Sequence, residues 1–403
     1  MFSSRTNWPL TPNRLSELLR ERRELGLPTL DLTESNPTRC GFEFDAEKIL
    51  SPLRNPRALH YEPDPRGLRT ARESIAEYYC ERGVRLDPDQ IFLTTSTSEA
   101  YSFVFRLLAN PGDSILAPQP SYPLFDFLGG LNDVEMAPYP LVYDDGWQVD
   151  LDSLARHWQS RTRAVLVVHP NNPTGSFLHQ RERGGTIELC RQNRAAIIAD
   201  EVFADYAYAA EADRVVTHAQ DSEALTFTLS GLSKISALPQ MKLAWIVVSG
   251  PPELRREAQA RLEVIADTYL SVSAPVALAT PHWLAQRHAL QTQILARVQS
   301  NLGKLDQLLA PDLPATRLRV EGGWYAILRV PSTRSDEDWA IAILTQAGVL
   351  VHPGHFYDFP SEGFLVLSLL PAPDLFGEAV RKIISIISAG SAGPTSQSAE
   401  RSA

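Results

Sequence analysis

Short apolar runs of strand length alternate with helical segments between about residues 90 and 250, and this alternation constrains the fold more than any other feature. The segment "QIFLTTSTSEAYSFVFRLLANPGDSILAPQPSYPLF" reads as a strand, a small-residue turn, a helix and a second strand, which is a βαβ unit. Further buried strands are supplied by "RAVLVVHPNNPTG", "AAIIADEV", "ALTFTLS" and "LAWIVVSG". The pattern predicts an α/β fold with a largely parallel sheet.

The flanking segments predict a second, smaller domain. Residues 11–25 have the spacing of an amphipathic helix, residues 68–82 form another that ends at Gly83, and residues 252–300 are helical throughout. Beyond about residue 315, "TRLRVEGGWYAILRV" and "GFLVLSLL" alternate as half-exposed strands. We expect an N-terminal arm with part of the small domain in 1–48, a large domain in 49–280, a small C-terminal domain in 281–390 and a disordered tail in 391–403.

Composition excludes several classes of protein. With 403 residues, 44% of them hydrophobic and 21% charged, the chain is typical of soluble globular proteins. A net charge of −10 argues against binding to nucleic acid or to an anionic membrane. Three scattered cysteines, Cys40, Cys80 and Cys190, fit a reducing compartment better than a disulfide framework or a zinc site. The absence of a secretory signal and of a run of ~20 apolar residues predicts a cytoplasmic protein.

Polar segments follow the predicted strands, and open α/β sheets bind ligands at that edge. In "TTSTSEA", the backbone amides and the hydroxyls of Thr97 and Ser98 could hold a phosphate at a helix N-terminus, or could merely cap the helix. In "HPNNPTG", the Asn, Pro and Gly residues are typical of a tight turn, but two adjacent Asn also offer amide donors. Asp200 directly follows an apolar strand, where a carboxylate is costly unless it meets a cation or caps a helix.

One lysine lies between two buried segments. In "LTFTLSGLSKISALPQMKLAWIV", Lys234 follows a strand-like run within a turn of small residues, and a second apolar run comes after it. A solvated loop lysine needs no such setting, whereas an amine that bonds a carbonyl compound does.

Phosphate cradle, Asn donor, buried acid and lysine, in this order on successive strands, resemble the fold-type I pyridoxal-phosphate (PLP) enzymes. The resemblance is closest to the class I/II aminotransferases and covers roughly residues 30–385. "HPNNPTG" and "SGLSK" with its following "LP" are the most specific motifs; "HYEPDPRGLRTARESIAEYY" and "HPGHFYDF" also look like family segments. The resemblance implies a large domain with a mostly parallel seven-stranded sheet between helices, and a smaller α+β domain built from both chain ends.

The resemblance also implies roles for individual residues. Lys234 would form the internal Schiff base with PLP and move the substrate Cα proton. Asp200 would keep the pyridine nitrogen protonated, Asn172 would donate to the phenolic oxygen, and Tyr122 would stack on the ring. The phosphate would be held by Ser96, Thr97, Ser98, Ser230, Ser233 and Lys242. Tyr61 matches a tyrosine that reaches the phosphate of the other subunit, which implies a homodimer with shared active sites, and no metal is implied.

Three positions depart from the family pattern. Lys242 stands where the family commonly has a phosphate-binding Arg, so a point charge replaces a planar fork. Phe203 stands where the family usually has a Tyr that donates to the phenolic oxygen, which leaves Asn172 as the main donor. Val366 in "GFLVLSLL" stands where the family has the Arg that grips the substrate α-carboxylate.

The loss of that arginine leaves two interpretations of the substrate site. Arg39, in "ESNPTR", could supply the missing cation, because the family places this segment over the site. Alternatively the substrate has no carboxylate at that point. Polar contacts would then come from His352, His355, Tyr269 and Tyr357, which could equally be packing or turn residues.

The sequence therefore predicts an aminotransferase that moves an amino group between an amino acid or amine and a keto acid or other carbonyl compound. The alternative is another PLP reaction on the same fold: β-elimination, decarboxylation or oxygen-dependent oxidation. A transcription regulator with this fold would need a DNA-binding domain, and only about 30 residues precede the core. A dehydrogenase would need a G-x-G-x-x-G motif after the first strand.

Overall fold

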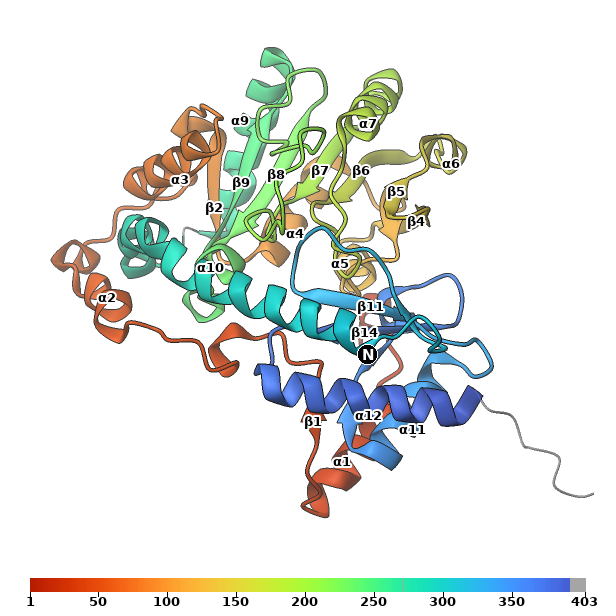
Figure 1. The fold of residues 1–403 in the computed structure, drawn as a ribbon. Helices are drawn as coiled ribbons and strands as arrows, with labels where there is room; N and C mark the ends of the chain where they lie inside the picture. The colour runs from red at the N-terminus through yellow and green to blue at the C-terminus, as the bar shows by residue number, and fades with distance from the viewer. Residues whose placement is uncertain (271, 392–403) are drawn as a thin grey trace, which may run out of the picture. The chain divides into compact units, whose positions relative to one another are not determined.

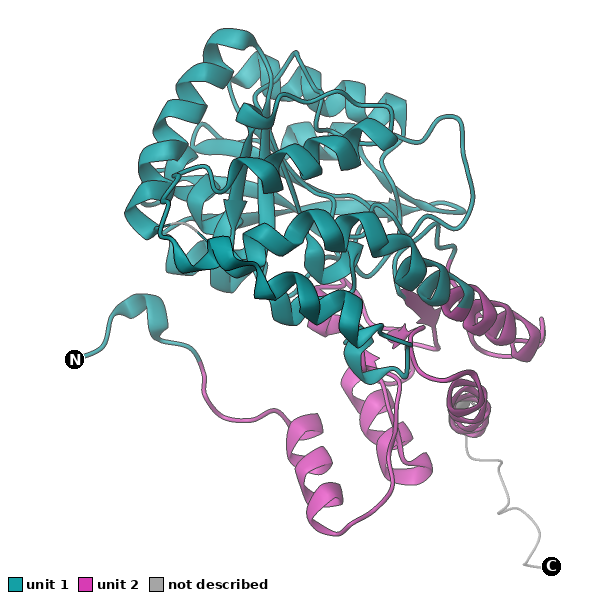
Figure 2. Cartoon of the chain, turned by 90° about the vertical axis from the view of Figure 1, so that its left-hand side faces the viewer, with its two compact units in different colours: residues 1–8, 36–296, 319–324 teal, residues 9–35, 297–318, 325–403 magenta. Residues whose placement is uncertain are grey.

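A computed structural model describes residues 1–270 and 272–391, and the chain divides into two compact units (Figures 1 and 2). The larger unit comprises residues 1–8, 36–296 and 319–324, and the smaller one comprises 9–35, 297–318 and the residues from 325 onward. The division expected from the sequence placed boundaries at 48/49 and 280/281. Almost all of the tail expected to be disordered, namely 392–403, lies outside the described residues.

An eight-stranded sheet forms the centre of the larger unit, in the order β2-β9-β8-β7-β6-β3-β4-β5 (Figure 1). The strands are β2 (Ile91–Thr94), β3 (Ser114–Gln119), β4 (Glu135–Tyr143), β5 (Trp147–Val149), β6 (Thr162–Val168), β7 (Ala196–Asp200), β8 (Thr226–Gly231) and β9 (Ala244–Ser249). Strands β8, β7, β6, β3 and β4 are parallel to one another, whereas β9 pairs antiparallel with β8 and β2, and β5 pairs antiparallel with β4. The mostly parallel sheet is confirmed, with one strand more than expected because the short β5 adds at the edge.

The two faces of this sheet bury alternate residues of each strand, as pleating requires. On one face Phe92, Phe227 and Ile246 pack with residues of α4 and α9. On the other, Leu93 and Trp245 pack with residues of α3 and of the first part of α10. Burial on both faces explains why the strands read as continuous apolar runs.

The helices of the larger unit are α2 (Ala46–Leu50), α3 (Arg69–Glu81), α4 (Thr97–Leu108), α5 (Phe125–Leu131), α6 (Leu151–Arg156), α7 (Gln180–Asn193), α8 (Leu232–Ile235) and α9 (Pro252–Tyr269). Helix α10 (Ala274–Leu308) begins in this unit and ends in the smaller one. The expected helix at 68–82 corresponds to α3, and Gly83 follows it with a φ of +81°. None of the described helices is long and apolar enough to cross a membrane.

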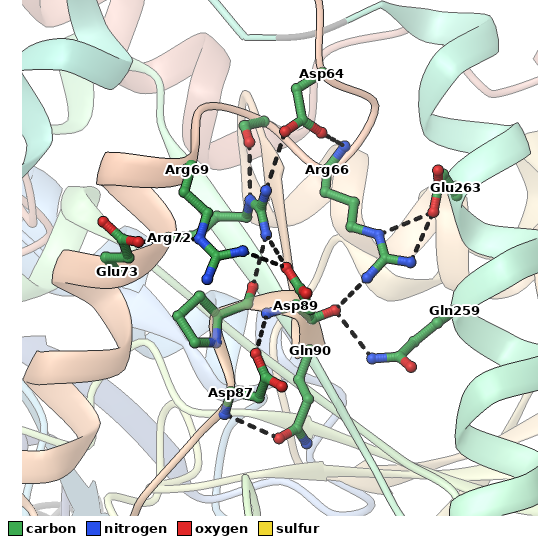
Figure 3. A network of polar contacts seen from close by, with 12 residues as sticks. Asp64, Arg66, Arg69, Arg72, Glu73, Asp87, Asp89, Gln90, Gln259 and Glu263 are labelled. Atoms are coloured by element: carbon green, nitrogen blue, oxygen red, sulfur yellow. Dashed lines mark hydrogen bonds and ion pairs between the residues drawn. The ribbon is translucent and has the colours of Figure 1, made fainter.

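A network of ion pairs fixes the segment that leads into α3 (Figure 3). The guanidinium of Arg72, whose side chain is 5% exposed, bonds Asp64 at 3.0 Å, Asp89 at 2.9 Å and the carbonyl oxygen of Gly67 at 2.9 Å. Gly67 has a φ of +86°, and a Cβ there would lie 2.5 Å from Cγ of Leu93. The network therefore holds a turn that only glycine can make.

The smaller unit is built from both ends of the chain, as expected. Its elements are α1 (Arg14–Glu24), β1 (Leu30–Asp31), β10 (Thr316–Arg317), β11 (Tyr325–Arg329), α11 (Asp336–Ala347), β12 (Val349–Leu350), β13 (His352–Pro353), β14 (Phe364–Ser368) and α12 (Pro373–Ser391). Strands β10, β11, β14 and β13 form an antiparallel sheet, and β1 pairs parallel with β12. Helix α1 corresponds to the amphipathic helix expected at 11–25.

Candidate active site

The carboxyl ends of four strands meet at one edge of the large sheet. Val168 of β6 pairs with Asp200 of β7, and Asp200 pairs with Leu229 of β8. Thr94 of β2 and Gly231 of β8 both pair with Ala244 of β9. This register brings together the four polar segments that were separate in the sequence, and it does so at the edge where α/β sheets bind ligands.

Lys234 lies in α8, directly after β8, in a turn held by hydrogen bonds to its backbone. Tyr206 Oη donates to the carbonyl oxygen of Lys234 at 2.7 Å, and Gln291 Nε2 donates to that of Ile235 at 2.9 Å. The side chain of Lys234 is partly buried. Burial lowers the pKa of its amine to about 8, and the carboxylate of Asp200 opposes this shift. A fraction of an amine with this pKa is unprotonated near neutral pH, and the unprotonated form can act as a nucleophile or a base.

Asp200 ends β7 with a buried carboxylate that is 7% exposed. Tyr101 Oη donates to Oδ2 at 2.7 Å, and the amide of Val202 donates to Oδ1 at 3.0 Å. Burial raises the pKa of Asp200, while these two hydrogen bonds and the charge of Lys234 lower it. Burial therefore acts on the pKa of Asp200 in one direction, and its hydrogen bonds act in the other. A cation placed beside the carboxylate would stabilise its charged form.

Asn172 and Tyr122 come from the loops after β6 and β3. Asn172 is 7% exposed, and within the described part of the chain its buried Oδ1 has no hydrogen-bond partner. Burial and the charge of Asp200 raise the pKa of Tyr122, so this phenol lies within electrostatic reach of the acid. Gly175 closes the Asn172 turn with a φ of +67°, where a Cβ would lie 2.3 Å from Cγ2 of Val320.

The residues expected to hold a phosphate lie on the adjacent strand ends. Ser96 caps α4, its Oγ accepting from the amide of Glu99 at 3.2 Å, so the capping interpretation holds for this hydroxyl. Thr97 and Ser98 form the first turn of α4, whose N-terminus favours an anion. Ser230 is buried at the end of β8, Ser233 is half-buried in α8, and Lys242 is exposed with a φ of +53°. Tyr61 is 76% exposed.

Phe203, at the position of the missing family tyrosine, lies against the lysine. Nζ of Lys234 lies 5.1 Å from the centroid of the Phe203 ring and 4.7 Å from that of Trp324. The sequence did not lead us to Trp324, nor to Tyr101. Tyr101 reads as one more apolar residue of an amphipathic helix. Trp324 reads as part of the predicted strand "TRLRVEGGWYAILRV".

The candidate substrate residues divide between the two units. Arg39 is exposed in the larger unit, at the end of a 3-10 helix (Pro37–Arg39). Val366 lies in the middle of β14, fully buried, and pairs with Ile327 and His352. Within the smaller unit, burial lowers the pKa of His352 to about 4, and its Nδ1 lies 3.1 Å from Oη of Tyr357. His355 is exposed and packs on Phe356. Position 366 and its partners therefore carry no positive charge at neutral pH.

The model of a known protein family matches most of the chain. Residues 42–375 match the model of the family "Aminotransferase class I and II". The chain belongs to the class I and II aminotransferases. It is 27% identical over 382 residues to the glutamate-pyruvate aminotransferase AlaA of Haemophilus influenzae, covering 92% of this chain and 93% of that one. The alanine aminotransferase of Mycobacterium tuberculosis is 26% identical, covering 85% and 81%.

Solved structures of aminotransferases share the fold. An aminotransferase from Escherichia coli superposes with a TM-score of 0.85 at 25% identity, covering 96% of this chain and 98% of that one. The alanine aminotransferase of Pyrococcus furiosus gives a TM-score of 0.84 at 22% identity, covering 96% and 99%. The fold is thus that of the fold-type I aminotransferases, and the enzyme transfers amino groups with PLP as its cofactor.

The residues of this aminotransferase fit PLP group by group. The aldehyde needs an amine, and Lys234 offers one that burial makes more nucleophilic. The ring nitrogen needs an acid, and the Asp200 carboxylate is buried beside the lysine. The phenolic oxygen needs a donor, which the Nδ2 group of Asn172 can supply, while the buried Oδ1 of the same amide is an acceptor without a partner among the described residues. The phosphate needs an anion site, and the N-terminus of α4 lies at the same sheet edge.

Proposed function

We propose that Lys234 bonds the cofactor and moves the substrate proton in this aminotransferase. When bound, PLP supplies the aldehyde and the electron-accepting ring. Lys234 would accept the substrate Cα proton on Nζ and deliver a proton to the carbon of the former aldehyde group, and its lowered pKa favours this transfer. The observation that carries this role is the proximity of that amine to Asp200, the buried acid at the end of the neighbouring strand.

The neighbouring residues would orient the cofactor. Asp200, held by Tyr101, would keep the ring nitrogen protonated. Asn172 would bond the phenolic oxygen, and Tyr122 would cover one face of the ring. Phe203 would border the lysine without donating a hydrogen bond. Because Asp200, Asn172 and Phe203 are buried, water would compete weakly for their contacts.

The phosphate would be held at the N-terminus of α4. Ser96, Thr97 and Ser98 would contribute amides and hydroxyls from β2 and α4, and Ser230, Ser233 and Lys242 would contribute from β8 and the turn after it. The register of β2, β8 and β9 supports this grouping. Lys242 would act as a point charge that is more tolerant of phosphate position than an arginine fork.

The substrates we propose are an α-amino acid and a 2-oxo acid. Support comes from the relatives named glutamate-pyruvate and alanine aminotransferase. With Val366 buried and uncharged, the α-carboxylate would be gripped by Arg39. His355 would border the substrate and contribute to selectivity.

The assembly we propose is a cytoplasmic homodimer that serves amino-acid metabolism, with residues 1–48 as an N-terminal arm. Leu59 and Tyr61 are 87% and 76% exposed within the described chain, which supports burial of this segment against a second copy. Tyr61 would reach the phosphate of the partner subunit. Sedimentation of the purified protein tests the dimer, and cofactor affinity of a Tyr61→Phe variant tests the shared site.

A spectroscopic panel tests the reaction. Single amino acids and amines are added to the holoenzyme, and the cofactor absorbance is followed together with the release of pyruvate, ammonia, carbon dioxide or peroxide. We expect conversion to the pyridoxamine form with several α-amino acids and no release of ammonia. Ammonia or carbon dioxide released without that conversion would contradict transamination and favour elimination or decarboxylation.

A further inference from the structure

Two aromatic rings, rather than an acid, are the groups that contact the amine of Lys234. Nζ lies 4.7 Å from the ring centroid of Trp324 and 5.1 Å from that of Phe203. Within the described residues, Nζ makes no hydrogen bond and no ion pair. Phe203 and Trp324 meet edge to face, with centroids 5.1 Å apart and planes at 77°. The side chain of Lys234 therefore ends beside two aromatic rings.

The segment that carries Trp324 is pinned to the loop after β7. The amide of Gly323 donates to the carbonyl oxygen of Tyr206 at 2.9 Å, and the amide of Tyr208 donates to that of Glu321 at 2.9 Å. A Cβ on Gly322 would lie 2.5 Å from the same Tyr206 oxygen. The glycine is thus required for this close approach, which fixes Trp324 against Phe203.

Tyr206 completes the arrangement from the backbone side. Its ring packs against Trp324 with centroids 5.0 Å apart, while its hydroxyl donates to the carbonyl oxygen of Lys234. We call Phe203, Tyr206 and Trp324 the aromatic box. Phe203 and Trp324 are buried, at 4% and 0% exposure, so water has little access to the two rings. It holds the lysine at both ends, by its carbonyl group and by its amine.

The physics of the box favours the protonated amine. A cation over an aromatic face is attracted by the ring quadrupole, and the attraction grows when water is excluded. The charge of Asp200, at the end of β7, also acts on Lys234 and also favours the protonated amine. Tyr101 of α4 acts on the lysine through its hydrogen bond to Asp200. Burial acts in the opposite direction and lowers the pKa of Lys234 to about 8.

We propose that Trp324 is a positioning residue for amino transfer, which together with Phe203 holds Nζ of Lys234 whenever that amine is not bonded to the cofactor. The inference rests on the proposed role of Lys234. In each half-reaction the lysine must leave the cofactor when the substrate amine takes its place. A free amine on a four-carbon stem would explore many rotamers, and contact with the two rings limits this freedom, most strongly once the amine has taken the proton and carries a charge.

Chemical labelling of Lys234 tests the proposal without relying on activity. The full chain, freed of cofactor, is treated with acetic anhydride at a series of pH values, and modification of Lys234 is followed by peptide mass spectrometry. Only the free base reacts, so the midpoint reports the titration of this amine. In Trp324→Leu the side chain stays apolar but becomes smaller, and the π face is lost. We expect the midpoint to fall by about 0.5 to 1 pH unit.

Two further variants serve as controls. Trp324→Phe keeps a π face and should keep the parent midpoint. Trp147→Leu removes another buried tryptophan of the same unit, in β5, and should not move the midpoint. A parent-like midpoint in Trp324→Leu would overturn the proposal. If that variant does not fold, Phe203→Leu takes its place, with the same expected direction and the same contradicting result.

Failure of this inference can be distinguished from failure of the proposed function. Borohydride reduction of the parent holoenzyme shows whether Lys234 carries the cofactor. Covalent trapping at Lys234 with an unmoved labelling midpoint in Trp324→Leu would overturn the role of Trp324 alone. Absence of trapping at Lys234 would overturn the role of the lysine itself, and the positioning role of Trp324 with it.

Discussion

The hydroxyl of Tyr101 donates a 2.7 Å hydrogen bond to Oδ2 of Asp200, and both side chains are buried. A donor to a carboxylate stabilises its charged form, so this bond counteracts the rise in pKa that burial causes. The charged form is the one that can pair with a protonated ring nitrogen. Tyr101 would therefore support the ring contact proposed for Asp200. No motif in the sequence marks Tyr101 for this role.

Replacing Tyr101 by Phe should raise the pKa of Asp200 by about 1 to 2 units, because a hydrogen bond to a charged group contributes about 1.5–3 kcal/mol. We expect kcat to fall about tenfold near neutral pH, with the acidic limb of the kcat profile displaced to higher pH. The control is Tyr139→Phe, which removes another buried hydroxyl, bonded to the carbonyl oxygen of Leu166. An acidic limb that stays in place in Tyr101→Phe would show that the hydroxyl does not act on Asp200.

Replacing Phe203 by Tyr should restore a donor to the phenolic oxygen. Such a donor stabilises the unprotonated form of the link between Lys234 and the cofactor. The midpoint of the absorbance change with pH should therefore fall, by about 1 unit for one hydrogen bond to a charged oxygen. A spectral pH titration measures it, and Lys234→Ala, which lacks the link, verifies the band assignment. Equal midpoints in parent and variant would count against this account of Phe203.

Replacing Arg39 by Leu should weaken the binding of amino-acid donors. A bidentate grip on a carboxylate is lost, so kcat/KM for alanine or glutamate should fall by about tenfold to a hundredfold, mainly through KM. Arg39→Lys should lie between, because it keeps the charge and loses the fork. Arg54→Leu, at another exposed arginine of the larger unit, is the control. An unchanged kcat/KM would contradict the carboxylate grip and direct attention to amine substrates.

Replacing Arg72 by Leu should destabilise the larger unit. The change removes hydrogen bonds to Asp64, Asp89 and two backbone carbonyls from a buried guanidinium (Figure 3). We expect the free energy of unfolding to fall by about 2–4 kcal/mol, measured by urea titration. Arg69→Leu is a matched control in the same network, since its ion pairs with Glu73 and Asp89 are exposed. Comparable losses in both variants would show that the burial of Arg72 is not what matters.

Most of the fold could be predicted from the sequence because it depends on local patterns, and the same patterns place the residues proposed for the cofactor site at one edge of the sheet. Strand-length apolar runs fix the sheet, and the turns that follow them carry Asn172, Asp200 and Lys234. Tyr101 and Trp324 were missed for a physical reason. Tyr101 fits the apolar face of an amphipathic helix, and Trp324 reads as part of a strand. Nothing in either local pattern indicates the contacts with Asp200 and Lys234.

The limit between the two units could not be read from the sequence for a similar reason. Helix α10 passes without interruption from one unit into the other, so no change of composition marks the point. The short segment 319–324 belongs to the larger unit although strands of the smaller one flank it. The close backbone approach between Gly322 and Tyr206 holds this segment in the larger unit. In the sequence, only the adjacent residues Gly322 and Gly323 indicate this approach.

Covalent attachment of the cofactor at Lys234 can be measured directly. The holoenzyme and its Lys234→Ala variant are reduced with borohydride, digested and mapped by mass spectrometry. We predict that the parent carries the reduced cofactor on the peptide containing Lys234, and that the variant carries none. A cofactor adduct on another lysine of the parent, or an undiminished covalent adduct in the variant, would contradict the account.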